Sequence, residues 1–72
     1  MIIKKEYRKN NTIQYTMIDN IDKVDVGTLD NGKNFINIYF KGNKQDEFET
    51  LVLDGITVYL MNNTGKTLAI YK

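Results

Sequence analysis

The 72-residue chain carries ten basic and nine acidic residues, a formal net charge of +1, and 42% hydrophobic residues. It contains no His, Cys or Ser, which excludes the commonest nucleophiles and neutral-pH bases, disulfides, and zinc sites built from Cys or His. We therefore expect one small domain over residues 1–72 that works by binding rather than as an enzyme and needs no cofactor.

Alternating apolar and polar residues predict a first hairpin from residues 2–8 and 12–18. A three-residue loop, residues 9–11, would place Tyr7 opposite Ile13, Lys5 opposite Tyr15, and Ile3 opposite Met17. One face of this hairpin would then be mainly apolar. The other face would be polar and solvated, and would carry Lys4, Glu6, Arg8, Thr12, Gln14 and Thr16.

Residues 19–23 connect this hairpin to the next and could hold one short helical turn. Residues 23–29 and 33–41 form the second expected hairpin, around a three-residue loop in which Gly32 takes the left-handed conformation. Apolar pairing then sets Val26 against Ile36 and Val24 against Ile38. Phe35, Tyr39 and Gly27 would share the opposite face.

Residues 47–53 and 56–61 flank Asp54-Gly55, a strong signal for a two-residue turn. This turn predicts a third hairpin that pairs Leu53 with Ile56 and Leu51 with Val58. Both of its faces are at least half apolar, so we expect a central position. A turn at residues 62–66 leads to a last strand, residues 67–71, with Leu68 and Ile70 pointing inward.

The sum is an all-β fold: six or seven short antiparallel strands in a hairpin meander, closed as a small barrel or folded as a two-layer sandwich. Since the chain has no Pro, its sheet edges must be protected by Lys, by bulges or by a partner strand. A domain this small has a thin stability margin, which favours a homo-oligomer.

Two motifs resemble binding sites only in part. Gly65-Lys66-Thr67 matches the end of a phosphate-binding loop, but Leu60 stands where that motif needs a glycine and a strand follows instead of a helix. Asp19, Asp22 and Asp25 lack the spacing of a calcium loop. We interpret the first as a hairpin turn and the second as solvated surface.

The charges fall in blocks of alternating sign, which favours pairing across neighbouring strands within the fold and also suits docking on a charged protein partner. The favoured surfaces are an acidic stretch, Asp46, Glu47 and Glu49, and the polar face of the first hairpin with Lys4, Glu6 and Arg8. Ile, Asn and Lys occur nine times each against one Ala and one Arg, a bias typical of AT-rich genes. The composition and size therefore favour a phage or mobile-element protein that docks on a host protein as an inhibitor or accessory factor.

Two alternatives stay open. A small barrel could bind nucleic acid through the aromatic residues Tyr7, Phe35 and Tyr39 beside Lys33 and Lys41. An oligomer could bind a nucleotide or another small ligand through the loop at residues 41–44, where Gly42 allows an anion-binding backbone. No apolar run is long enough to span a membrane, and the short apolar start does not resemble a signal peptide, so we expect a cytoplasmic protein.

Overall fold

A computed structural model of the chain describes residues 1–42 and 48–72, which form seven β-strands. Each predicted extended segment overlaps one of them, and the third strand begins at Ile21, two residues before its predicted start, so the all-β prediction is confirmed. The strands are β1 (Ile2–Tyr7), β2 (Thr12–Met17), β3 (Ile21–Thr28), β4 (Asn34–Phe40), β5 (Phe48–Val52), β6 (Ile56–Met61) and β7 (Thr67–Tyr71).

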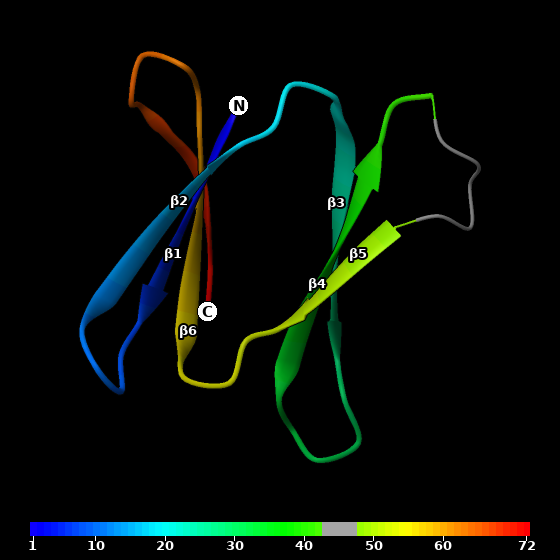
Figure 1. The fold of residues 1–72 in the computed structure, drawn as a ribbon. Helices are drawn as coiled ribbons and strands as arrows, with labels where there is room; N and C mark the ends of the chain where they lie inside the picture. Colours follow the sequence, from blue (N-terminus) through cyan, green and yellow to red (C-terminus); the bar gives the residue numbers. More distant parts are fainter. Residues whose placement is uncertain (43–47) are drawn as a thin grey trace.

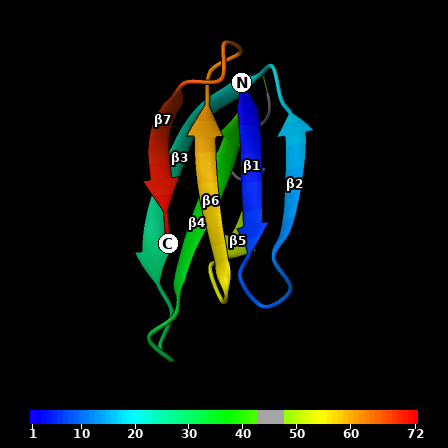
Figure 2. The same ribbon diagram turned by 90° about the vertical axis from the view of Figure 1, so that its left-hand side faces the viewer.

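The strands make two antiparallel sheets that pack face to face (Figure 1). One has four strands in the order β2-β1-β6-β7, and the other has three in the order β3-β4-β5. Over the described residues the sheets do not join into a closed barrel, so of the two predicted architectures the two-layer sandwich is the one formed. Figure 2 shows β7 lying over β3 and β6 over β4, whereas β2 extends past the three-stranded sheet.

The core lies between the sheets and is aliphatic. Ile3 and Val58 from the four-stranded sheet meet Ile36 and Ile38 of β4 and Leu53, and each of the five is at most 6% exposed. β2 contributes no residue to this core, because all six of its residues are exposed.

The second hairpin forms as predicted. Val26 pairs with Ile36 and Val24 with Ile38, and Gly32 takes a φ of 84° in the loop. The Asn31 side chain accepts a hydrogen bond from the Lys33 backbone N–H at 3.0 Å. An asparagine that bonds the backbone two residues on stabilises such a turn locally.

The predicted register of the first hairpin is wrong by one residue. Tyr7 pairs with Thr12 and Lys4 with Tyr15, because the loop has four residues, 8–11, rather than three. Asn11 adopts the left-handed conformation, with a φ of 55°. The shift turns Ile13, Tyr15 and Met17 to the outside of the sandwich, where they are 48%, 61% and 69% exposed.

The predicted hairpin around Asp54-Gly55 is also wrong, because its two strands lie in different sheets. β5 pairs with β4, and β6 pairs with β1 and β7. The Gly55 carbonyl instead accepts a hydrogen bond from the Arg8 N–H at 2.9 Å. The prediction of a central position holds for β6, which has a neighbour on both sides, but not for the edge strand β5.

Two smaller expectations also fail. The connection before β3 does not form a helical turn, since residues 21–23 already belong to the strand. In β7, Leu68 and Ile70 point outward and are 49% and 52% exposed. Tyr71 packs against the core instead, opposite Val58.

Candidate interaction surface

The outer side of the four-stranded sheet carries an apolar surface that continues from one edge strand to the other. Strand pairing places Met17, Ile2 and Met61 in one row and Tyr15, Lys4, Tyr59 and Ile70 in the next. We call this outer side the open face. Its exposed apolar side chains belong to the two edge strands and are Ile13, Tyr15, Met17, Leu68 and Ile70.

The middle of the open face is partly covered by one lysine. The Lys4 ammonium lies 4.8 Å from the centre of the Tyr59 ring. Lys4 therefore covers the ring and keeps a positive charge in the centre of the apolar surface. The edge strands on either side lack such a cover.

The end of the open face next to the β1–β2 loop is polar. The Arg8 guanidinium donates a hydrogen bond to the Thr57 hydroxyl at 2.7 Å, and Thr57 is only 4% exposed. Arg8 also lines a hollow of about 310 Å³ together with Glu6, Asn11 and Ile13. The open face thus combines apolar edges with charged groups of both signs.

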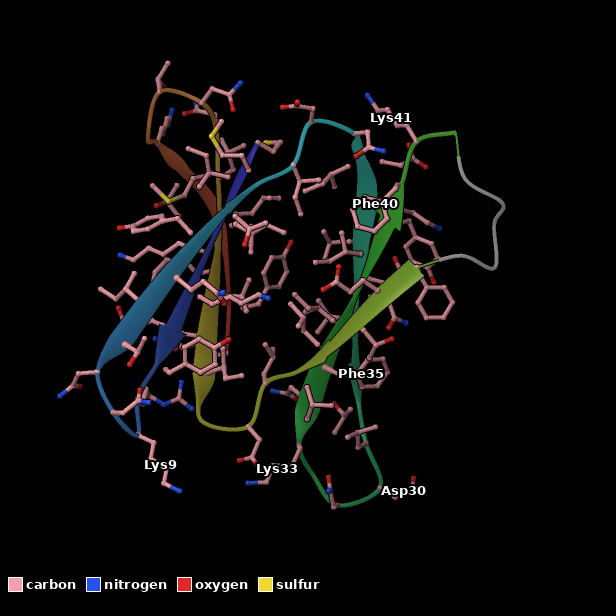
Figure 3. All side chains as sticks on the ribbon, in the orientation of Figure 1. Lys9, Asp30, Lys33, Phe35, Phe40 and Lys41 are labelled. Carbon is pink, nitrogen blue, oxygen red and sulfur yellow. The ribbon has the colours of Figure 1, made fainter. Side chains whose placement is uncertain are left out.

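The outer side of the three-stranded sheet exposes fewer large apolar side chains, Phe48 at 45% and Val52 at 41%, and its aromatic rings lie against neighbouring groups. The Tyr39 and Phe48 rings lie 5.0 Å apart, and the Lys23 ammonium lies 4.7 Å from the Tyr39 ring. Phe35 points away from the four-stranded sheet (Figure 3) and its ring covers Gly27, where a Cβ atom would come within 2.4 Å of it. We call this outer side the closed face.

The structure brings some of the predicted protein-binding residues together. Lys4, Glu6 and Arg8 share the open face. The predicted polar face is nevertheless wrong, because the one-residue shift puts Thr12, Gln14 and Thr16 on the inner side and Ile13, Tyr15 and Met17 beside the three charged residues. Glu49 is exposed on β5 in the other sheet. Asp46 and Glu47 lie outside the described residues.

The predicted nucleic-acid residues do not gather on one surface. Tyr7 lies in β1 and donates a hydrogen bond to Gln14 at 3.3 Å, whereas Phe35 and Tyr39 lie on the closed face. Lys33 forms an ion pair with Asp54 at 3.1 Å. Lys41 is exposed at the far end of β4 from Lys33 (Figure 3).

The remaining motifs resolve into turns and strands. Gly65 takes a φ of 90° in the turn before β7, and the Asn62 N–H there bonds the Lys66 carbonyl at 2.9 Å, so the turn interpretation is confirmed. Of the predicted anion-binding loop, Lys41 is exposed, Gly42 has a φ of 83°, and residues 43–44 lie outside the described residues. Across residues 1–42 and 48–72, no group of three acidic side chains is placed to hold a metal ion. None of those residues forms a helix able to cross a membrane.

Sequence reasoning missed the apolar residues of the open face. Ile13, Tyr15 and Met17 were expected in an apolar face beside Ile3, and Leu68 and Ile70 were expected inward. One available signal was Asn10-Asn11, because Asn tolerates the left-handed conformation and so permits a loop of four residues as well as three. The Asn10 side chain accepts a hydrogen bond from the Thr12 N–H at 3.1 Å.

Comparison with models of known protein families gave no match, and neither curated proteins nor solved structures gave one. The functional conclusion therefore depends on the geometry and chemistry of the open face.

Proposed function

We propose that this protein is a non-enzymatic binding module that docks on another protein through the open face. The observation that carries the proposal is the set of exposed apolar side chains on the edge strands β2 and β7, with the half-buried Ile2 and Met61 lying between them on the open face. Single exposed apolar residues are ordinary in small proteins, but a contiguous set bordered by polar groups is typical of interaction sites.

The side chains of the open face indicate what kind of partner surface would fit it. Tyr15, Met17 and Ile70 offer large apolar side chains, the kind that supply most of the binding energy in protein interfaces. Lys4 and Arg8 place positive charge beside them, with Glu6 between the two. A partner surface with an apolar centre and carboxylates opposite Lys4 and Arg8 fits this arrangement.

The bias toward AT-rich codons supports a phage or mobile-element origin, and a host protein is then the expected partner. A small domain that covers a working surface of a host protein acts as an inhibitor or an accessory factor. The partner would be bound in the cytoplasm.

A comparison of two matched variants tests the proposal. Ile70→Lys puts a charge in the open face, and Val52→Lys does the same at a 41% exposed position of the closed face. We expect capture of a specific host protein from lysate by the wild-type chain and by Val52→Lys, and loss of capture by Ile70→Lys.

Nuclease treatment of the lysate separates this proposal from the nucleic-acid alternative. Capture that survives nuclease and depends on Ile70 supports protein docking. If both lysine variants capture the same protein equally well, the open face is not the docking surface. If nuclease abolishes capture, nucleic acid mediates it.

A further inference from the structure

The four sheet edges of the described strands are protected to different degrees. β3 has a register shift near Ile21 and carries Asp22, Lys23 and Asp25. β5 has only five residues and carries Glu49, and β7 has a register shift opposite Met61. β2 has six residues, no charge and a regular ladder to β1.

An edge strand without charge, proline or bulge is a template for pairing with another strand. The residues of β2 are Thr, Ile, Gln, Tyr, Thr and Met, of which Thr, Ile and Tyr favour extended backbone. No strand of the other sheet covers β2 (Figure 2). The strand is therefore both chemically suited to pairing and physically accessible.

The ladder to β1 determines which backbone groups of β2 remain free. The Ile18 N–H bonds the Met1 carbonyl at 2.9 Å, and hydrogen-bonded pairs recur at every second residue of an antiparallel ladder. Thr16, Gln14 and Thr12 therefore bond toward β1. The N–H and C=O groups that point away from β1 belong to Ile13, Tyr15 and Met17.

We propose that β2 pairs with β2 of a second copy of this chain, antiparallel and centred on Tyr15, to form a continuous eight-stranded sheet. In this register Tyr15 lies opposite the second copy's Tyr15, and Ile13 lies opposite its Met17. The three residues with free backbone groups thus pair with one another, as the hydrogen-bonding phase requires.

The same register satisfies the side chains. Residues directly opposite in an antiparallel pair point to the same face, so the apolar residues of both copies stay on the open face. Gln14 lies opposite Thr16 on the other side of the sheet. β2 contains no charged residue, so the pairing places no like charges opposite one another.

The pairing has two-fold symmetry, the commonest symmetry of soluble oligomers. It would bring two open faces side by side on one sheet. This inference concerns the edge of β2 and does not rest on the docking proposed above, which uses the outer surface.

Cysteine cross-linking tests the register, because the chain has no cysteine of its own. Opposed residues of a hydrogen-bonded pair lie about 5.5 Å apart at Cα, within the range of a disulfide. We expect Tyr15→Cys to form a covalent dimer under mild oxidation and Gln14→Cys, at the exposed neighbouring position, to stay monomeric. Cross-linking through Gln14→Cys but not Tyr15→Cys would overturn the register.

A charge pair tests the same contact in solution, with sedimentation measured over a range of concentrations. Ile13→Lys and Met17→Glu should each raise the dissociation constant of the dimer by about tenfold or more, since each leaves a charge opposite an apolar side chain. The double variant should recover the dimer, because each new lysine would face a new glutamate. Circular dichroism checks that every variant is folded.

The result expected for the unmodified chain is a dimer of twice the 8.4 kDa chain mass. A monomer at every concentration overturns the inference. So does a dimer that Ile70→Lys breaks and Ile13→Lys leaves intact, because that result places the contact on the outer surface near β7. Loss of partner capture by Ile70→Lys with the dimer preserved would support both proposals independently.

Discussion

The two outer faces of the sandwich are built from similar residues but use them differently. On the closed face, Tyr39 contacts both Phe48 and Lys23, and the Thr50 hydroxyl donates a hydrogen bond to the Asn37 side chain at 2.8 Å. On the open face, Tyr15 and Ile70 extend into solvent. The difference shows that apolar residues on a small β-sandwich can stabilise the fold or remain available for a partner, depending on their cross-strand neighbours.

Replacing one tyrosine on each face by alanine gives the largest expected difference in the free energy of unfolding. Tyr39→Ala removes an aromatic contact and a cation–π contact, and should lower the free energy of unfolding by about 2 kcal/mol. Tyr15→Ala should lower it by less than about 0.5 kcal/mol, because the side chain is 61% exposed. Thermal melting of both variants at low protein concentration measures the difference.

At a concentration where the chain is monomeric, equal losses for the two variants would remove the distinction between the faces. A larger loss for Tyr15→Ala would reverse it.

Arg8 tests the polar end of the open face, where a side chain does contact the fold. Arg8→Ala should lower the free energy of unfolding by about 1 kcal/mol, because the buried Thr57 hydroxyl loses a charged hydrogen-bond donor. Lys9→Ala, at the exposed neighbouring position of the same loop, serves as the control and should have no effect. Chemical denaturation with urea measures both.

If Arg8→Ala and Lys9→Ala leave the protein equally stable, the bond to Thr57 does not contribute to folding.

Substitution of Gly27 gives the smallest expected change in the free energy of unfolding. The sign of that change depends on the residue at position 35. Gly27→Ala pushes the Phe35 ring aside, since a Cβ atom would lie 2.4 Å from it, and should cost about 0.5 kcal/mol after the gain from a less flexible unfolded chain. In a Phe35→Leu background the same substitution should be neutral or stabilising. Thermal melting of the four chains gives the coupling between the two positions.

A cost for Gly27→Ala that persists unchanged in the Phe35→Leu background would show that the ring does not cover the glycine as described.

The sequence allows the strands to be predicted better than their partners. Apolar pairing and a glycine suited to the left-handed conformation both favour the observed register of the second hairpin, so the prediction holds there. Asp54-Gly55 carries an equally strong local turn signal, yet the chain uses it to cross between sheets. A turn sequence determines the local bend but not which strand will lie beside the next one.

The open face was harder to predict for a related reason. Alternation assigns Ile13 and Tyr15 to one side of β2 but does not say which side faces the core. That choice depends on the length of the β1–β2 loop and on what lies opposite β2. Because the three-stranded sheet ends short of β2 (Figure 2), no core contact opposes turning its apolar side outward.

The register of the first hairpin is the feature on which the open face and the proposed β2 pairing both depend. Nuclear Overhauser contacts between Hα atoms measure it directly, since opposed Cα atoms are closest, at about 4.5 Å, in the pairs without hydrogen bonds. The account predicts Hα–Hα contacts between Lys4 and Tyr15 and between Glu6 and Ile13. Hα–Hα contacts between Lys4 and Thr16 and between Glu6 and Gln14 in their place would indicate the register that pairs Lys5 with Tyr15. That register would return the apolar residues of β2 to the inner side and contradict the account.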